Sequence, residues 1–430
     1  MAMIGRALQQ VKRQLEHFVT DADVEQLCRQ HDHAFRRGKL GGPAGSVHLM
    51  LLQLLAAVSL SGLRHAAQAD ATKQAIGKAR TRLPLAVWMA LARRVCPPGP
   101  APSSLWRGLR VLVADAASCL TEDTASLSKK YGKAKNGRRG TAHGRPTPKL
   151  LAVLDLAEGF IHQVIALPWA RQERACLARL FKACGAGAVL LGDRGMVGFA
   201  HLALMRAAGV EGCFRLPRWL VVSGRGKGNR RVARRLGRQD VLVTWRKTRR
   251  VGWMSRRRWD RLPAELTLRQ VSFRITRRGF RTNWAWLVTT LTDPRLYPAE
   301  ALVELYGKRW QIEVYFRDLK RTLKLRQTAA RTAAGVRKEI LAFVVLYNLV
   351  RQVMLRAAQR QGVDADRVSF ADAARWLLWS EPGAAPIDLV VNPRRRRDTQ
   401  PRMLKHGRRK YARLNKPRSQ LAKPACEAKL

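Results

Sequence analysis

The chain has 430 residues, of which 47% are hydrophobic, and this length predicts roughly two to four domains. Lysine and arginine number 82 against 30 aspartates and glutamates, which gives a formal net charge of +52 at pH 7. A positive field of this size argues against a free-standing enzyme for small molecules and indicates a polyanionic partner.

The first hundred residues have a helical pattern. Apolar residues recur at three-and-four spacing in 24–30, 47–58 and 83–95. The segment 96–104, "CPPGPAPSS", would end any helix and predicts a domain boundary. We therefore expect an all-helical N-terminal domain over residues 1–104.

An α/β pattern follows in residues 105–330. Apolar runs typical of strands occupy 110–115, 149–156, 160–168 and 188–193, with a helical run at 171–184 before the last of them. This order predicts an α/β domain. Between about 209 and 295 the pattern changes to short apolar pieces separated by basic turns, which indicates a β-rich insertion in that domain.

The rest of the chain is helical and then basic. Helical patterns cover 299–320, 338–355 and 370–379, so residues 331–392 are expected to form a C-terminal helical region. Residues 393–430 are rich in arginine and proline and poor in apolar residues. This tail is predicted to be disordered in the absence of a polyanionic partner.

Two apolar stretches, 47–63 and 340–350, are candidates for membrane spans. The first contains polar residues and the second is short, so both fit buried core helices better than a span of about 20 apolar residues. The N-terminus has no signal-peptide pattern, and the seven cysteines contain no CxxC pair. These features predict a cytoplasmic protein with reduced thiols and no membrane partner.

The positive charge is concentrated in three separated runs. Residues 129–149 hold eight lysines and arginines and no acid, 218–261 hold sixteen against two, and 393–424 hold thirteen against one. A single run of this kind is typical of a solvated loop. Three runs without an amphipathic basic helix favour nucleic acid over a membrane surface.

Two aspartates stand at the ends of predicted strands. Asp115 ends "RVLVAD" and Asp193 ends "AVLLGD", where α/β proteins gather their ligands. Asp155 lies before a hairpin turn, and we assign it no catalytic role. A single aspartate of this kind is usually a cap or loop residue. With a third carboxylate, however, the pair would suit two oxygen-ligated Mg²⁺ ions and phosphodiester chemistry.

The segment 306–320, "YGKRWQIEVYFRDLK", supplies that carboxylate. At about 100° per residue, Tyr306, Arg309, Glu313 and Lys320 fall within one arc of roughly 60°, with Arg317 and Lys324 beside them. Cations around a carboxylate keep it ionised and can bind phosphate oxygens. Taken alone, the helix would be better explained by an ion pair between Arg309 and Glu313 on a solvated face.

These residues make the sequence recognisable. The spacing of Tyr306, Arg309, Glu313 and Lys320 resembles the signature helix of bacterial DDE transposases of the insertion-sequence-four type. "LLGDRG" resembles the second-Asp motif of that family. The resemblance implies a ribonuclease H-like catalytic domain with a β-strand insertion between Asp193 and Glu313. Two departures are that Asp115 is followed by Ala116, and that Met196 replaces the aromatic residue common after the second Asp.

The resemblance also implies roles for individual residues. The expected ligands of two Mg²⁺ ions, for which Mn²⁺ could substitute, are Asp115, Asp193 and Glu313. The expected DNA contacts are Tyr306, Arg309 and Lys320 with the neighbouring Arg317 and Lys324, while Trp286, or second Trp284, would stack on a displaced base.

The family resemblance implies a cut-and-paste transposase acting on its own insertion sequence. It would hydrolyse phosphodiesters at terminal inverted repeats and transfer the freed ends to target DNA. A homodimer in a synaptic complex on double-stranded DNA, associated with the nucleoid, is expected. Two alternatives stay open: a metal-dependent nuclease without strand transfer, and a catalytically silent DNA-binding protein.

Overall fold

A computed structural model describes residues 2–35, 40–66, 71–97, 99, 104–135, 142–223, 226, 228–274, 284–381, 384–386 and 388–393. The described helices and strands, except the last residue of β10, lie within one unit formed by residues 1–273 and 284–394. The basic tail predicted at 393–430 lies outside the described residues, apart from its first residue.

A nine-stranded sheet forms the centre of this unit, in the order β5-β4-β1-β6-β7-β11-β10-β9-β8. β1 pairs with β4 and β4 with β5 in antiparallel fashion, whereas β6 and then β7 continue parallel to β1. Counted along the chain, β1, β4, β5, β6 and β7 are the first to fifth strands of this sheet. Across the sheet they lie in the order third, second, first, fourth, fifth, which is the ribonuclease H-like arrangement. Their bounds are β1 (Arg110–Ser118), β4 (Lys149–Asp155), β5 (Ile161–Leu167), β6 (Ala188–Gly192) and β7 (Val210–Arg215).

The apolar runs form strands because both faces of the sheet are covered. β4 and β6 are buried along almost their whole length, as expected for central strands packed on two sides. Alternate residues of β1 enter different cores, with Val111 and Val113 in one and Leu112 and Ala114 in the other. The four strands expected at 110–115, 149–156, 160–168 and 188–193 are therefore confirmed.

The predicted insertion extends the same sheet. β11 pairs antiparallel with β7, and the sheet continues through β10 and β9 to β8 at its edge. β7, which lies inside the range 209–295, is the fifth strand of the ribonuclease H-like sheet and precedes the added strands. The added strands are β8 (Arg230–Gly237), β9 (Asp240–Arg246), β10 (Glu265–Arg274) and β11 (Trp284–Thr289).

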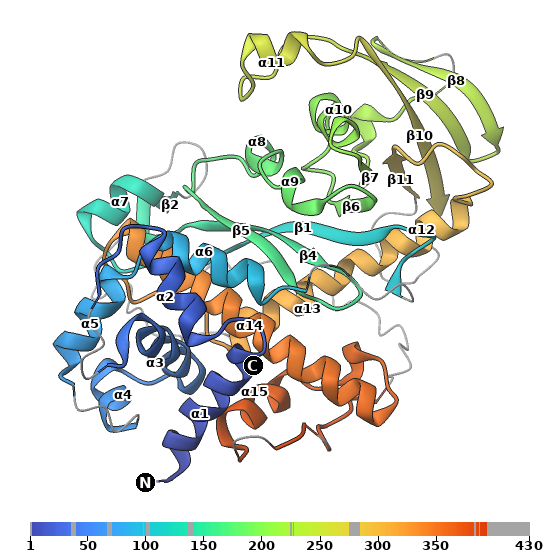
Figure 1. Cartoon of the computed structure of the whole chain (residues 1–430). Helices are drawn as coiled ribbons and strands as arrows, with labels where there is room; N and C mark the ends of the chain where they lie inside the picture. The colour runs from blue at the N-terminus through green and yellow to red at the C-terminus, as the bar shows by residue number, and fades with distance from the viewer. Residues whose placement is uncertain are drawn as a thin grey trace, which may run out of the picture. The chain divides into compact units, whose positions relative to one another are not determined.

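Helices cover the two faces of the sheet (Figure 1). On one side lie the short helices between β5 and β7; on the other lie the N-terminal helices together with the C-terminal ones. The first set is α8 (Arg174–Leu177), α9 (Phe181–Cys184) and α10 (Phe199–Ala207). The second set includes α1 (Ala2–Glu16), α2 (Asp21–Arg29), α3 (Gly42–Ala56), α4 (Leu60–Ala66), α5 (Lys73–Arg82), α6 (Leu85–Arg94), α14 (Ala333–Gln361) and α15 (Phe370–Trp379).

Smaller elements complete the unit. A two-stranded sheet of β2 (Lys133–Lys135) and β3 (Ala142–Pro146) lies within the first basic run. The remaining helices are α7 (Ala125–Tyr131), α11 (Arg256–Asp260), α12 (Ala299–Gly307) and α13 (Gln311–Arg317).

The long helix α14 joins the N-terminal helices to the sheet. Its N-cap is Thr332, whose side chain accepts a hydrogen bond from the N–H of Gly335, and its C-cap is Gly362 in the left-handed conformation. Its length and composition would allow it to cross a membrane, but 83% of its most apolar window is buried inside the protein. Because it contacts α3, α6 and α15, the helices before and after the predicted boundary at 96–104 share one hydrophobic core.

Candidate active site

Asp115 and Asp193 are brought together by two neighbouring strands, β1 and β6. β1 continues to Ser118, so Asp115 lies inside the strand and not at its end as expected, whereas Asp193 directly follows β6, which ends at Gly192. β1 and β6 run parallel, and Val113 pairs with Leu191. Asp115 and Asp193 each follow that pair by two residues, so they lie at the same level on strands about 4.8 Å apart. Two-residue periodicity also puts Asp115 on the face of Val113, the face on which α12 and α13 pack. The structure thus brings these two predicted residues together.

Asp115 lies in a mixed electrostatic environment, with 29% of its side chain exposed. Its Oδ1 accepts a hydrogen bond of 2.8 Å from the N–H of Ala116, and its Oδ2 lies 3.6 Å from Nη1 of Arg309. Burial raises the pKa of Asp115, as do the nearby charges of Asp193 and Glu173, whereas the Ala116 N–H and Arg309 lower it. A cation at this position would therefore relieve charge repulsion between carboxylates.

Glu173 was not singled out from the sequence. It directly precedes α8, after the third strand of the sheet, and its Oε1 lies 3.4 Å from Nζ of Lys149. Its charge nevertheless reaches Asp115. Only the sheet topology could have revealed this proximity, because 58 positions separate Glu173 from Asp115 in the sequence.

The signature helix is not a continuous α-helix, contrary to the assumption behind the predicted arc. α12 ends at Gly307, residues 308–310 form a 3₁₀ turn, α13 covers Gln311–Arg317, and residues 318–322 form a π-helical turn. Glycine is a poor helix former, and it stands where the α-helix gives way to the tighter turn. With these changes in helical pitch, Tyr306 and Arg309 are buried, Lys320 is half-buried and Glu313 is exposed.

Tyr306 and Arg309 are buried against the ends of the strands. The Tyr306 hydroxyl donates a hydrogen bond of 3.4 Å to the carbonyl of Gly192, just before Asp193. Gly192 is required there, since a Cβ would lie 2.5 Å from the ring of Phe214. The guanidinium of Arg309 lies 5.8 Å from the ring of Tyr306 and 5.3 Å from that of Trp310. Arg309 thus faces Asp115. The ion pair considered between Arg309 and Glu313 of one helix is replaced by an ion pair between Arg309 and Asp115 of β1.

Glu313 is exposed in the first turn of α13. α13 packs beside β1, so Glu313 is on the helix adjacent to the strand of Asp115. Within the described part of the chain, however, no three histidine, cysteine, aspartate or glutamate side chains are grouped closely enough to hold a metal ion. The structure therefore joins Asp115 and Asp193 and leaves Glu313 outside that pair.

The predicted cations occupy different environments. Lys320 is half-buried in the π-helical turn. It lies close to Cys119, just after the end of β1, because its charge acts on that thiol: burial raises the pKa of Cys119 to about 12, and Lys320 lowers it. Arg317 is exposed, and its Nε lies 3.7 Å from Oδ1 of Asp318. Lys324 is exposed with a φ of 65°.

Trp286 lies away from the two aspartates. It is half-buried in β11 and packs with the core on the opposite face of the sheet from Asp115. The guanidinium of Arg218 lies 5.9 Å from its ring. Trp284, two residues earlier and therefore on the same face, is 39% exposed. Stacking of either ring on a base stays a prediction.

The paired aspartates fit a hard divalent cation. Both offer carboxylate oxygens, the ligands that Mg²⁺ and Mn²⁺ prefer. The raised pKa of Asp115, caused by burial and neighbouring negative charge, indicates a position where a cation is favourable. In this structure, Arg309 is the cation that lies against Asp115.

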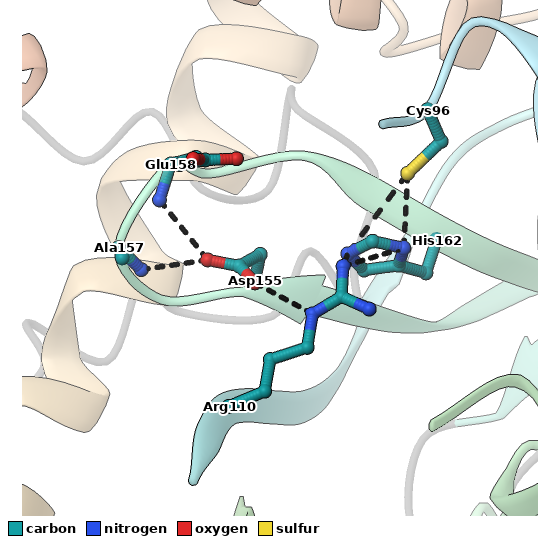
Figure 2. A network of polar contacts seen from close by, with 6 residues as sticks. All are labelled: Cys96, Arg110, Asp155, Ala157, Glu158 and His162. Carbon is teal, nitrogen blue, oxygen red and sulfur yellow. Dashed lines mark hydrogen bonds and ion pairs between the residues drawn. The ribbon is translucent and has the colours of Figure 1, made fainter. Parts of the chain in front are cut away.

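Asp155 has the structural role expected for it (Figure 2). Its Oδ1 accepts hydrogen bonds from the N–H groups of Ala157 and Glu158 at 2.9 and 3.0 Å, which forms the turn between β4 and β5. Its Oδ2 lies 3.0 Å from Nε of Arg110, the first residue of β1. Asp155 therefore fixes the start of the strand that carries Asp115.

A half-buried histidine, His162, extends this network toward the N-terminal helices (Figure 2). Nη2 of Arg110 lies 2.6 Å from Nε2 of His162, and Sγ of Cys96 lies 2.9 Å from Nδ1. A guanidinium can only donate, so Nε2 accepts, and the imidazole is neutral with its proton on Nδ1. Burial lowers the pKa of His162 to about 4, and the charge of Arg110 acts in the same direction.

The same turn holds the two helices that flank the site. The Tyr315 hydroxyl of α13 donates to the Leu156 carbonyl at 2.9 Å. Asn348 of α14 exchanges two hydrogen bonds of 3.0 Å with the backbone of Ile161, and Arg351 donates to the Glu158 carbonyl. These contacts fix the position of α13 relative to β1.

A cavity of about 310 Å³ lies on α13 next to α14 and α15. It is lined by Arg317, Asp318 and Arg351, and burial raises the pKa of Asp318 to about 6. Asp115 and Asp193 do not line it. The chemistry indicated by the paired aspartates therefore belongs to the strand ends and not to this cavity.

Comparison with known proteins identifies the family of the chain. Residues 106–349, more than half of the chain, match the family model described as the transposase DDE domain. The transposase InsG of insertion sequence element IS4 from Escherichia coli (strain K12) is 24% identical over 329 residues, which cover 72% of this chain and 71% of InsG. The putative transposase y4zB of Sinorhizobium fredii (strain NBRC 101917 / NGR234) is 34% identical over 112 residues, 26% of this chain and 30% of that protein.

Among solved structures, the piggyBac transposase in a synaptic complex with hairpin DNA is 9% identical with a TM-score of 0.44, covering 85% of this chain and 78% of that one. The family model spans the sheet, the insertion and the signature helix. The IS4 relative covers most of both chains. The protein therefore belongs to the family of DDE transposases, and it is of the insertion-sequence-four type.

Proposed function

We propose that this transposase moves its own insertion sequence by a cut-and-paste reaction. It hydrolyses phosphodiesters at the terminal inverted repeats and transfers the resulting 3′-hydroxyl ends to target DNA. The observation that carries the proposal is that Asp115 of β1 and Asp193, directly after β6, both follow the pair Val113–Leu191 by two residues, beside the helix with the signature residues.

The proposed metal ligands are Asp115, Asp193 and Glu313, which would hold two Mg²⁺ ions, or Mn²⁺ in their place. Such ions supply an activated attacking oxygen and stabilise the leaving oxygen of the phosphodiester. Glu313 joins the pair by turning its flexible side chain from solvent toward β1. The turn between β4 and β5 keeps α13 at a fixed position during this change.

The proposed DNA contacts surround these carboxylates. Exposed cations bind phosphates with little rearrangement, whereas Tyr306 and Arg309 are buried and require a local change. The residues are Tyr306, Arg309, Arg317, Lys320 and Lys324, with Trp286 stacking on a base.

The remaining regions are assigned by charge and position. The helices of residues 1–104 recognise the element ends, and the basic runs, including the tail 393–430, bind phosphates without reading sequence. Two ends must be cut and joined together, so a homodimer assembles on DNA. We expect the protein to associate with the bacterial nucleoid for the same electrostatic reason.

The decisive experiment uses the purified full chain, Mg²⁺ and a duplex that carries the inverted repeat flanking its coding region. The variants are Asp115→Asn, Asp193→Asn and Glu313→Gln. Glu304→Gln is the matched control, since Glu304 of α12 is 74% exposed and pairs with Lys308. We expect the three variants to bind the duplex but lose cleavage, while the control cleaves and joins normally.

Other results would change the assignment. Equal nicking by the wild type and Glu313→Gln would remove Glu313 from the ligand set. Cleavage without joining would favour a nuclease. Binding without cleavage by the wild type, with either metal, would favour a silent DNA-binding protein.

A further inference from the structure

Arg309 occupies the side of Asp115 that a metal ion would need. Oδ1 of Asp115 is engaged by the N–H of Ala116, and Oδ2 faces the guanidinium of Arg309 at 3.6 Å. The Arg309 side chain is only 8% exposed. A divalent cation approaching Oδ2 would therefore meet a buried positive charge, and the two cations would repel each other at short range.

The contact between Arg309 and Asp115 is not an optimal one. At 3.6 Å it is longer than a charge-assisted hydrogen bond of about 2.7–2.9 Å. Nε of Arg309 is buried and has no hydrogen-bond partner within the part of the chain that the structure describes. A buried donor without a partner is costly, so Arg309 has donor capacity that Asp115 does not use.

A phosphate diester would use this capacity better. The planar guanidinium binds phosphate oxygens through two parallel hydrogen bonds, and its Nε is one of the available donors. Tyr306 precedes Arg309 and Trp310 follows it in the sequence. Their rings lie 5.8 and 5.3 Å from the guanidinium, and these contacts keep the guanidinium close to Asp115. A short movement toward bound DNA would free Oδ2 of Asp115.

We propose that Arg309 couples DNA binding to metal loading: without DNA it neutralises Asp115 and excludes the cation, and a DNA phosphate draws it away. This inference rests on the proposed function, because it takes Asp115 as a metal ligand. Coupling of this kind is reciprocal, so metal and DNA each strengthen the binding of the other. The arrangement restricts metal loading at Asp115 to the DNA-bound protein.

The test measures Mn²⁺ binding directly, from the electron paramagnetic resonance signal of free Mn²⁺, with and without a short DNA duplex of arbitrary sequence. For the wild type we expect the duplex to tighten Mn²⁺ binding by about 5- to 150-fold, the usual range of coupling between sites. Arg309→Gln should bind Mn²⁺ more tightly than the wild type without DNA, and DNA should add little. Arg309→Lys, which retains the charge, should resemble the wild type.

Two further variants separate the possible failures. Lys308→Gln removes a neighbouring but 58% exposed charge, and it should leave Mn²⁺ affinity unchanged if the effect is specific to Arg309. Asp115→Asn should lose Mn²⁺ binding. If Asp115→Asn loses binding but a folded Arg309→Gln, checked by circular dichroism, binds no more tightly than the wild type, the coupling is refuted and the proposed function stands. If Asp115→Asn binds Mn²⁺ normally, the metal assignment itself fails.

Discussion

Replacement of His162 by glutamine should make the protein less sensitive to acid. Burial lowers the pKa of His162 from 6.5 to about 4, so the folded protein keeps the imidazole neutral while the unfolded chain binds a proton below pH 6.5. The stability that depends on neutral His162 is therefore complete above pH 6.5 and is lost as the pH falls toward 4. The difference between 6.5 and about 4 corresponds to about 3 kcal/mol across this window.

The assay is the free energy of unfolding from urea titrations at pH 7 and pH 4. His162→Gln retains an acceptor for Arg110 but cannot be protonated, so its loss of stability between these pH values should be smaller than that of the wild type by about 3 kcal/mol. His201, whose pKa burial also lowers to about 4, leaves a residual acid sensitivity in the variant. The exposed His31→Gln serves as the control. Equal pH dependence in wild type and His162→Gln would refute the neutral assignment.

Three further outcomes are expected. Asp240→Asn should lower the free energy of unfolding in urea by about 3–5 kcal/mol, because it removes the carboxylate that neutralises the fully buried Arg269. Arg246→Gln breaks an exposed ion pair and should cost less than about 1 kcal/mol in the same assay. Asn348→Leu should cost about 2–4 kcal/mol in the same assay, since two buried hydrogen bonds to Ile161 are lost and its backbone groups stay buried. DNA affinity, measured by fluorescence anisotropy, should fall about 10³-fold or more between 50 and 200 mM salt, and a nearly constant affinity would contradict phosphate-dominated binding.

The sequence predicts the central strands well because they are buried on both faces. The runs at 149–155 and 188–192 contain almost only apolar residues, and no surface helix would tolerate them. The sequence pattern predicts a basic turn where the structure has β8, because five of the eight residues in Arg230–Gly237 are Arg or Gly. An edge strand has one side facing solvent and tolerates such charge, so composition alone does not identify it.

The pairing of Asp115 with Asp193 could be anticipated, and the position of the signature helix could not. Aspartates near the carboxyl ends of adjacent parallel strands come together at one edge of the sheet, whatever the length of the connection, although β1 continues three residues beyond Asp115. The partner of Arg309, in contrast, depends on the 3₁₀ turn after Gly307 and on how α12 docks against β6. Ideal helical geometry placed Arg309 beside Glu313, whereas packing placed it against Asp115.

The shared core of α3, α6 and α14 has a consequence for synthesis of the chain. The ribosome completes α6 at Arg94, but the helix that covers it begins only at Ala333. The apolar surfaces of α3 and α6 that pack against α14 therefore have no partner until most of the chain has been translated. Contacts so distant in sequence slow folding and expose the nascent chain to aggregation. We expect the newly made N-terminal segment to be a client of ribosome-associated chaperones.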